Sequence, residues 1–266
     1  MVSIIISFYE RLDHLKCCLD SLSLCASAFD EVVVADDGSS PKTVEAFREH
    51  IKRYEFPITH AWQPNEGFRL AASRNNGIRQ ARGDYLIFLD CDFLVLPDTI
   101  TEHLQAARPG KAVAGGFKYL DEPSTTEILK TSVTTGLLRK LDGEMSNREI
   151  LKRHRRTIKR TILIRLRLKN PKSQSLGSHY SIHKSDLERI NGYDENFVGW
   201  GGEDEDLGIR LVRAGIHCRS AVPYAKVLHL WHKPAITDRR WQEGPNIQYF
   251  NRKEIPVFCE NGLKKP

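Results

Sequence analysis

Strand-like apolar segments alternate with helix-like segments along the first 118 residues, and this alternation restricts the fold more than any other feature. Residues Val2–Phe8 have the unbroken apolar pattern of a buried strand, and leucines at three- and four-residue steps predict a helix after them. Further strands are predicted at 31–35, 58–62 and 85–89, with helices between them. Such alternation is typical of a parallel sheet flanked by helices. We therefore expect an α/β fold with a Rossmann-like, mostly parallel sheet.

The alternation weakens after residue 111. Strands are predicted at Ala112–Phe117, His179–His183 and Ala225–Leu230, and a helix at Asp204–Ala214. Residues 120–178 are polar and charged and predict only weak helical stretches. The expected organisation is one domain in two halves, with an insertion between the halves and an extension after them. These four parts occupy, in chain order, residues 1–118, 119–178, 179–234 and 235–266.

Composition and the length of apolar runs indicate a protein that works in the cytoplasm. The 266 residues, 40% of them hydrophobic, are enough for a substantial core. The longest apolar runs have strand length and fall far below the roughly 18 residues that span a bilayer. The N-terminal residues lack the pattern of a secretory signal, and the six cysteines contain no C-x-x-C pair. We therefore expect a cytoplasmic protein with reduced thiols.

Positive charge is concentrated in one segment. The chain has a formal net charge of +6, whereas residues 139–172 carry 13 lysines and arginines and three acidic residues, a local net charge of +10. Such a segment serves as a solvated helical surface, a nucleic-acid site or a contact for anionic lipid. Residues 158–168 interleave isoleucine and leucine with lysine and arginine, without the aromatic residues that base stacking uses. This pattern favours peripheral contact with the inner face of an anionic membrane over nucleic acid.

Two pairs of acidic residues follow predicted strands. Asp36 and Asp37 end the second strand, and Asp90 and Asp92 follow the fourth. Ligands of parallel sheets bind beyond the carboxyl ends of the strands, where these carboxylates are expected. Asp90 and Asp92 suit a divalent cation that bridges a diphosphate. The alternatives are a solvated turn and, for Asp36 and Asp37, capping of the next helix.

The most specific motif is a glycine- and acid-rich sequence, Gly199-Trp200-Gly201-Gly202-Glu203-Asp204-Glu205-Asp206. Its paired glycines permit close approach or unusual backbone angles, and its tryptophan offers a flat face for a sugar ring. Glu203 and Asp204 stand at a predicted helix start, where acids also complement the helix dipole. A general base here and a divalent cation at the strand ends are together the groups needed to transfer a sugar from a nucleotide to a hydroxyl.

Together these motifs resemble the family-two glycosyltransferases of the GT-A fold. The second half is similar to galactosyltransferases and N-acetylgalactosaminyltransferases of the type that includes bacterial chondroitin polymerase and animal β-1,4-galactosyltransferases. The resemblance covers residues 2–118 and 179–232, and it implies a GT-A fold and a UDP-sugar donor. The matching segments are the first strand, Asp36 to Ser39, Asn65 to Arg69, Ala72 to Asn75, Gly83 to Asp92, Gly192 to Asp194, Gly199 to Asp206, and His229.

The resemblance implies a metal site with Asp92 as a direct ligand and a histidine from the last predicted strand. Asp90 is implied as a contact to the ribose or to metal-bound water, at the edge of the same site. His229 is favoured over His232, on the spacing from Val227 alone. Imidazole beside carboxylate shifts the preference from Mg²⁺ toward Mn²⁺.

The resemblance also implies contacts to the donor. An acid at Asp36 or Asp37 accepts a hydrogen bond from the uracil ring, and the other acid is then available for capping. Arg74 and Asn75 are implied to lie near the donor diphosphate or base. The alternative for these two residues is a position on the helix surface.

For the acceptor, the resemblance implies a general base, Asp204, and a ligand of the acceptor sugar, Glu203. The wider acceptor site is implied to comprise Trp200, Gly201, Gly202 and Glu203. Glu205 stands where the animal enzymes have a third consecutive aspartate. This difference leaves the identity of the acceptor open.

The implied reaction is an inverting, metal-dependent transfer of a hexose from a UDP-sugar to a hydroxyl of a glycan acceptor, in cell-surface polysaccharide or lipopolysaccharide synthesis. Galactose or N-acetylgalactosamine is favoured, with glucose as a further candidate, and the acceptor is free or lipid-linked. A nucleotidyltransferase is one alternative, although Ser7–Arg11 is not the glycine- and lysine-rich phosphate loop expected of one. A noncatalytic carbohydrate- or membrane-binding protein is the other. The sequence does not indicate an oligomeric state.

Overall fold

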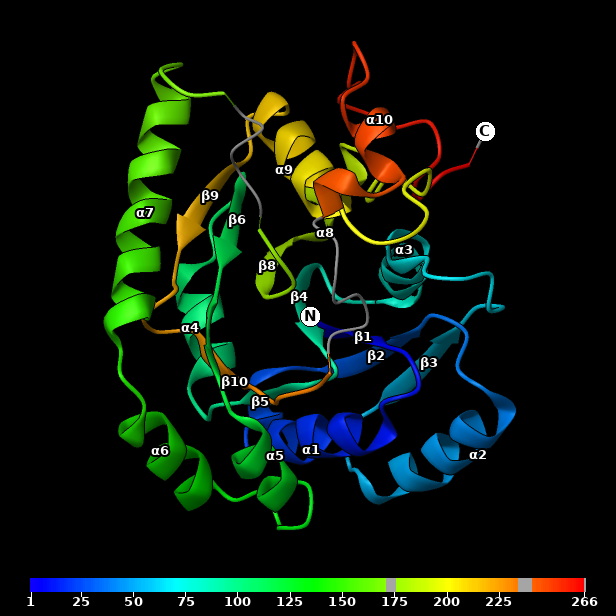
Figure 1. The fold of residues 1–266 in the computed structure, drawn as a ribbon, viewed down its shortest axis with the longest axis vertical. Helices are drawn as coiled ribbons and strands as arrows, with labels where there is room; N and C mark the ends of the chain where they lie inside the picture. Colours follow the sequence, from blue (N-terminus) through cyan, green and yellow to red (C-terminus); the bar gives the residue numbers. More distant parts are fainter. Residues whose placement is uncertain (171–175, 234–240, 266) are drawn as a thin grey trace.

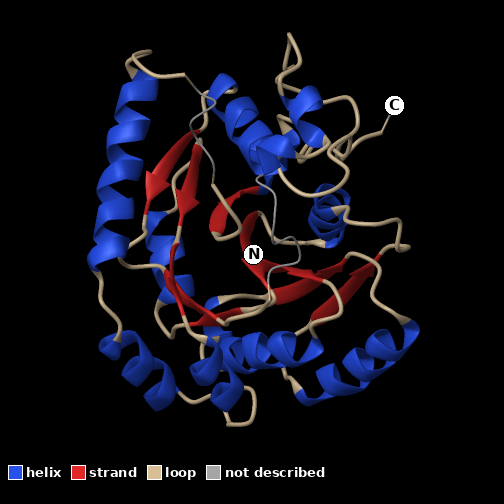
Figure 2. Ribbon diagram, in the orientation of Figure 1, coloured by secondary structure: helices blue, strands red, loops and turns tan. Residues whose placement is uncertain are grey.

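A seven-stranded sheet forms the centre of the molecule. The computed structural model describes residues 1–170, 176–233 and 241–265. The strand order of this main sheet is β3-β2-β1-β4-β8-β6-β9. Its strands are β1 (Val2–Phe8), β2 (Glu31–Asp36), β3 (Ile58–Trp62), β4 (Tyr85–Asp90), β6 (Lys111–Ala114), β8 (Tyr180–His183) and β9 (His217–Ser220). Figures 1 and 2 show helices on both sides of the sheet.

The strands of the first half are parallel, as predicted. β1 pairs with β2 and β4, and β2 pairs with β3. The register places Phe8 opposite Asp36 and Ser7 opposite Asp90. β1, β2 and β4 are buried on both faces, which is typical of parallel strands and accounts for their apolar sequences, whereas the edge strand β3 is only partly buried. Asp36 and Asp90 therefore lie at the same edge of the sheet, on either side of the end of β1.

Helices cover both faces of the parallel strands. The helices of the first half are α1 (Leu12–Ser23), α2 (Pro41–His50), α3 (Leu70–Gln80) and α4 (Thr99–Ala106), with short 3-10 turns at Ala26–Ala28 and Ile51–Arg53. Ile5 of β1 packs in the core that includes Ile78 of α3, whereas Ile6 packs in the core that includes Leu19 of α1. Successive residues of a strand face opposite sides, so β1 needs apolar side chains at consecutive positions.

β8 joins the two halves of the chain. It pairs antiparallel with both β4 and β6, and β6 pairs parallel with β9. Two helices follow β8 in the second half, α8 (Lys184–Glu188) and α9 (Glu203–Arg213). Leu207 and Leu211 of α9 belong to the same core as Ile78 of α3, so α3 and α9 share one face of the sheet.

A second sheet has three strands in the order β5-β10-β7. Its strands are β5 (Phe93–Val95), β7 (Gly116–Tyr119) and β10 (Lys226–His229). The prediction of one strand at Ala112–Phe117 is wrong, because the chain leaves the main sheet at Gly115 and enters the second sheet at Gly116. Glycine is needed at both positions. A Cβ atom on Gly115 would lie 2.4 Å from the His179 ring, and one on Gly116 would lie 2.1 Å from the Val222 carbonyl oxygen.

The insertion contains more regular helix than its sequence predicts. Its helices are α5 (Glu122–Ile128), α6 (Thr135–Glu144) and α7 (Arg148–Arg165). α7 has 18 residues but buries only Ile150 and Ile164 completely, so its apolar periodicity is too sparse to indicate a long helix. Residues 171–175, which include part of the predicted basic segment, lie outside the described chain. Within the described residues, every helix is too short or too polar to cross a bilayer.

Residues 241–265 of the predicted C-terminal extension pack against the second half. They contain a 3-10 turn at Trp241–Glu243 and a short helix, α10 (Asn246–Phe250). Phe250 and Ile255 form a small core with Phe197 and Ile209, the latter from α9. Residues 235–240 and 266 of the extension lie outside the described chain. The extension therefore supports α9 although its sequence has little periodicity.

Candidate active site

Asp36 is buried at the end of β2 and fixed by two neighbours. Its Oδ1 accepts a hydrogen bond from the Ser39 backbone N–H at 2.8 Å, and its Oδ2 lies 2.8 Å from Nε2 of His60. The helix cap considered for this acid is provided by another residue. Ser40 Oγ accepts the hydrogen bond from the Thr43 backbone N–H at the start of α2.

Asp37 is held by the segment that precedes α3. Its Oδ1 accepts a hydrogen bond from Gln63 Nε2 at 2.7 Å, and its Oδ2 accepts one from the Arg69 backbone N–H at 2.8 Å. Burial is the main cause that raises the pKa of Asp37. The two neighbouring acids thus have separate sets of partners at the same sheet edge.

Asp92 and two histidines form a compact group of side chains that could hold a metal ion. His232 Nε2 lies 3.2 Å from Asp92 Oδ2, and His229 Nε2 lies 3.8 Å from Asp92 Oδ1. One ligand atom from each residue lies within 4.8 Å of the other two. The sequence favours His229, and the structure brings both histidines to Asp92.

Backbone pairing fixes the position of this group. His229 ends β10 and lies opposite Phe93 of β5 in an antiparallel pair. The Leu230 backbone N–H donates a hydrogen bond to the Asp92 carbonyl at 2.8 Å. The strand that carries the histidine therefore lies directly beside the segment that carries the aspartate.

The electrostatics of the group favour an ionised carboxylate. Burial opposes the ionisation of Asp92, but the hydrogen bond from His232 and the charges of His229 and Arg11 outweigh it, so the pKa of Asp92 lies below its usual value. The Asp92 contact raises the pKa of His232, whereas burial lowers the pKa of His229. Asp92 Oδ1 is buried and has no hydrogen-bond partner within the described residues. The group therefore offers a charged oxygen with unused capacity beside imidazole nitrogens.

Arg74 lies between the two acidic motifs. It is 1% exposed, and its guanidinium lies over the Tyr193 ring. Its Nη1 donates a hydrogen bond to Asp204 Oδ1 at 2.9 Å, and its Nη2 lies 3.5 Å from Asp90 Oδ1. Its Nε donates a hydrogen bond to Ser7 Oγ at 3.2 Å. Arg74 therefore links the end of β4 to the start of α9.

The loop before α9 depends on glycine. Gly199, Gly201 and Gly202 have φ values of 87°, 92° and 95°, which side chains rarely permit. The side-chain amide of Asn246 donates hydrogen bonds to the carbonyls of Gly199 at 3.2 Å and Gly201 at 2.8 Å. Trp200 remains 39% exposed between them. The loop is thus held from the C-terminal segment while its indole stays accessible.

The first two acids of α9 differ in environment. Glu203 is buried, and its Oε2 has no hydrogen-bond partner within the described chain. Burial, followed by the charge of Asp204, raises the pKa of Glu203 to about 8. The Asp204 side chain is 20% exposed and contacts Arg74. Burial also raises the pKa of Asp90 to about 6, although the charge of Arg74 opposes this shift. With a pKa of about 8, Glu203 is therefore largely neutral at pH 7, and it stands next to the partly exposed side chain of Asp204.

Asp206 has a structural position. It is fully buried and pairs with Arg210 Nε at 2.6 Å and with Arg252 Nη2 at 2.7 Å. Arg252 also lies 3.3 Å from Asp194. The fourth acid of the motif therefore ties α9 to the C-terminal segment.

Asn75 is fully buried behind the second half of the site. Its Nδ2 donates hydrogen bonds to the Tyr193 carbonyl at 2.8 Å and to Glu195 Oε1 at 2.9 Å, and its Oδ1 accepts one from the Tyr193 backbone N–H. These contacts fix the turn that precedes the glycine loop. The donor contact implied for Asn75 stays a prediction, as do the other substrate contacts.

Sequence reasoning missed several residues that shape the site. Arg11 donates a hydrogen bond to Asp92 Oδ2 at 3.2 Å. Its position in the sequence, just after a central strand, could have indicated a role at this sheet edge. His60 contacts Asp36 from β3, again near a strand end. Asn246 and Arg252 lie in a segment without periodicity or motif, so the sequence carried no signal for them.

Two protein-family models match the chain and together cover both halves of the site. The model described as "Glycosyl transferase family 2" matches residues 3–171. The model described as "N-terminal domain of galactosyltransferase" matches residues 160–233. The first match includes the acids at the strand ends, and the second includes the glycine- and acid-rich motif and both histidines.

Characterised relatives include sugar transferases and a polysaccharide synthase. The chain is 30% identical to a chondroitin synthase of Escherichia coli over 97% of its own length and 39% of the relative. It is also 30% identical to a validoxylamine A glucosyltransferase of Streptomyces hygroscopicus subsp. jinggangensis (strain 5008), over 81% of its length and 52% of the relative. The chain thus spans about half or less of these relatives.

Solved structures share the fold. A structure of GalNAc-T7 with UDP, GalNAc and Mn²⁺ covers 87% of this chain with a TM-score of 0.58 at 17% identity, and the chain covers 44% of it. A mannosyltransferase from Pyrobaculum calidifontis with GDP-Man and Mn²⁺ covers 88% with a TM-score of 0.56 at 16% identity, and the chain covers 58% of it. The predicted GT-A fold is thereby confirmed. Because a family model matches more than half of it, the chain belongs to glycosyl transferase family 2 and is a glycosyltransferase.

Proposed function

We propose that the protein transfers a hexose from a UDP-sugar to a hydroxyl of a glycan acceptor, with inversion at the anomeric carbon. The observation that carries this proposal is the position of Arg74 between Asp90 and Asp204. Arg74 is a buried cation with Asp90, at the end of β4, on one side and Asp204, at the start of α9, on the other. Inverting transfer needs a metal site and a base, and no protein nucleophile.

The side chains at the strand ends fit a divalent cation. Asp92 Oδ1 is buried without a hydrogen-bond partner in the described chain, and two imidazoles lie within reach of the same site. Asp92, His229 and His232 would hold the ion, and mixed carboxylate and imidazole ligands favour Mn²⁺ over Mg²⁺. When bound, such an ion offsets the charge that grows on a departing diphosphate.

Asp204 is proposed as the general base that accepts the proton of the attacking acceptor hydroxyl. Its partial exposure and its place beside the Gly199–Gly202 loop support this role. Arg74 holds its carboxylate through Oδ1, which leaves Oδ2 for the acceptor. Glu203, neutral at pH 7, can donate a hydrogen bond to an acceptor oxygen from its buried position. Trp200 offers its exposed ring as a face for the acceptor sugar.

The donor is proposed to be UDP-galactose or UDP-N-acetylgalactosamine, with UDP-glucose as a further candidate. The match to a galactosyltransferase model and the fold shared with a UDP- and GalNAc-bound structure support this order. Asp36 or Asp37 would accept the hydrogen bond from uracil. The acceptor is proposed to be a growing cell-surface glycan, free or lipid-linked, as the name of the chondroitin synthase relative suggests.

UDP release by the purified protein tests the proposal. UDP-galactose, UDP-N-acetylgalactosamine and UDP-glucose are supplied with short glycan acceptors, in manganese and in excess chelator. We expect manganese-dependent UDP release that increases with acceptor, and an elongated product with the opposite anomeric configuration to the donor. Release that is unaffected by chelator, or a product that retains the donor configuration, would contradict the mechanism.

A further inference from the structure

The outer face of α7 exposes a stripe of large apolar side chains. They recur at steps of seven, four and four residues, which places them on one side of a helix with 3.6 residues per turn. Each is between 41% and 62% exposed, and together they are Leu151, Ile158, Ile162 and Leu166. Ile150 and Ile164, on the other side, are buried. Single exposed apolar residues are ordinary on a protein surface, but the three at successive four-residue steps, Ile158, Ile162 and Leu166, form a continuous run that indicates a partner.

Basic residues border this apolar stripe, and the exposed Arg155 interrupts it between Leu151 and Ile158. The exposed lysines and arginines along α7 are Arg148, Lys152, Arg155, Arg156, Lys159 and Arg165. The single acidic residue of the helix is Glu149, in its first turn. An apolar stripe between lysines and arginines is the pattern of a helix that lies at a membrane surface.

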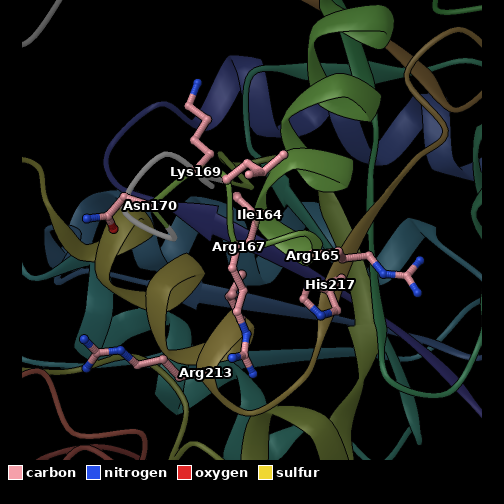
Figure 3. A pocket seen from close by; sticks show the side chains of 9 residues that line it. Ile164, Arg165, Arg167, Lys169, Asn170, Arg213 and His217 are labelled. Atoms are coloured by element: carbon pink, nitrogen blue, oxygen red, sulfur yellow. The ribbon is translucent and has the colours of Figure 1, made fainter.

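A basic cavity of about 730 Å³ lies at the C-terminal end of α7. Its charged lining consists of Arg165, Arg167, Lys169 and Arg213, with His217 beside them, and none of the described lining residues has a carboxylate. Figure 3 shows these side chains at the end of α7 and beside α9, with the charged ends of Lys169, Arg165 and Arg213 pointing in different directions. Arg213 donates a hydrogen bond to the Ile255 carbonyl, whereas Arg165, Arg167 and Lys169 have no ion pair within the described chain.

The turn that ends α7 brings its last basic residues to this cavity. The Leu168 backbone N–H donates to the Leu163 carbonyl at 2.8 Å, and Arg167 has a φ of 57°, which is uncommon for a residue other than glycine. Basic residues also complement the C-terminal ends of α7 and α9, but each helix end carries only about half a negative charge. The cavity therefore keeps a surplus of positive charge.

We propose that the basic cavity and the end of the apolar stripe nearest to it, Ile162 and Leu166, dock together on a bilayer that contains anionic phospholipid. The cavity accepts the phosphate of a headgroup, and the stripe enters the boundary between headgroups and acyl chains. An anionic bilayer supplies both the phosphates that the basic cavity can bind and the apolar layer that the stripe can enter. The cavity lies at the Arg213 end of α9, opposite Asp204, so the proposal does not depend on the transfer chemistry.

Cosedimentation of the full chain with vesicles tests the electrostatic part. We expect binding to mixed phosphatidylglycerol and phosphatidylcholine vesicles at low salt, weaker binding at high salt, and none to phosphatidylcholine alone. The triple variant Arg165→Gln, Arg167→Gln, Lys169→Gln should lower the partition coefficient about tenfold or more. Lysine at positions 165 and 167 should preserve binding.

A control with the same charge change separates the cavity from net charge. It replaces three exposed basic residues near α2 by glutamine, namely Lys42, Arg48 and Lys52. This variant should bind vesicles within about twofold of the parent. Equal losses in the two triple variants, or no vesicle binding by the parent at low salt, would overturn the proposal. Binding of the parent to a DNA duplex but to no vesicle would overturn it in favour of nucleic acid.

The apolar part is tested by Ile162→Ser together with Leu166→Ser. Both side chains are exposed, so the melting temperature should stay close to that of the parent, and it is measured as a check on folding. Vesicle binding should fall about tenfold or more, because two apolar side chains no longer leave water. The control is Val257→Ser with Phe258→Ser, which are also exposed, on the C-terminal segment. Unchanged binding by the α7 variant would show that the stripe stays in water and would end the proposal.

Discussion

The guanidinium of Arg74 donates a hydrogen bond to Asp204 across 2.9 Å, although 130 positions separate the two residues in the chain. The same guanidinium lies 3.5 Å from Asp90, so one buried cation serves both the donor side and the acceptor side of the proposed site. A change of charge on either side is therefore expected to alter the other.

Asp204→Asn should abolish transfer while leaving UDP binding intact. The asparagine oxygen can still accept the hydrogen bond from Arg74, and Asp90 remains to balance the arginine charge, so the protein should fold. Loss of a general base typically costs about 10²–10⁴-fold in rate. Single-turnover transfer and UDP binding by calorimetry measure the two effects. Transfer within a factor of two of the parent would exclude Asp204 as the base.

Asp206→Asn, two residues along the same helix, should instead lower stability. Arg210 is fully buried and would lose its charged partner, and loss of one member of a buried pair typically costs about 3–5 kcal/mol. Urea unfolding measures this loss. Activity of the folded fraction should stay close to that of the parent, since Asp206 contacts Arg210 and Arg252 and lies away from the acceptor. A stable but inactive Asp206→Asn protein would contradict the structural role.

Excess chelator should stop transfer, and manganese should restore it. His229→Ala and His232→Ala should each raise the manganese concentration for half-maximal activity about tenfold or more, because changes around a metal site typically cost this much affinity. His50→Ala, at the end of α2, is the control and should behave as the parent does. If only one histidine variant needs more manganese, the other imidazole does not bind the ion. Full activity in chelator would rule out the site.

Glu203→Gln should make the protein more stable relative to the parent as pH rises. The pKa of Glu203 is about 8 in the folded protein, against an ordinary value of 4.5. Between these values the unfolded chain gains from ionisation and the folded protein does not, so the stability of the parent falls across this window and the glutamine variant lacks the loss. The melting-temperature difference should therefore grow between pH 4.5 and about 8 and level off above it. A difference that is constant with pH would contradict the buried neutral carboxyl.

Asn246→Ala should weaken acceptor binding without affecting the donor. The amide of Asn246 supports the carbonyls of Gly199 and Gly201, and loss of such buried hydrogen bonds costs about 1–3 kcal/mol. A more mobile Gly199–Gly202 loop should raise KM for the acceptor and leave the affinity for UDP unchanged. Asn261→Ala, which removes a side-chain contact with Asn196 elsewhere in the same segment, is the control. Equal effects of Asn246→Ala on both substrates would mean that the whole site has shifted.

The parallel half of the sheet was predictable because both faces of its strands are buried, which leaves long apolar runs such as Val2–Phe8. β5 was not, since three residues are too few to show a period, and β9 was not, since it buries a single residue and lacks an apolar pattern. The break at Gly115 depends on a contact with His179, 64 residues later, which no local pattern records. α7 was underestimated because it buries few side chains, which makes its apolar period too sparse to indicate a long helix.

The candidate site was predictable where its side chains follow strand ends or begin a helix, as with Asp92 and Asp204. The resemblance implied a histidine at the end of β10. No sequence pattern indicates that His232, three residues later, also contacts Asp92. The partner of Arg74 depends on how α9 packs against α3. Support from Asn246 depends on a segment with no pattern at all.

The strand that carries Asp90 has neighbours from both halves of the chain, β1 on one side and β8 on the other. The two halves of the domain, residues 1–118 and 179–234, are therefore not independent folding units that could be exchanged between relatives. A chimera joined within the insertion would have to keep the β4–β8 register, in which Tyr85 lies opposite His183, or Asp204 of the second half would lose its contact with Arg74 of the first half. Exchange of the two halves is thus constrained at the middle of the sheet, where β4 and β8 pair.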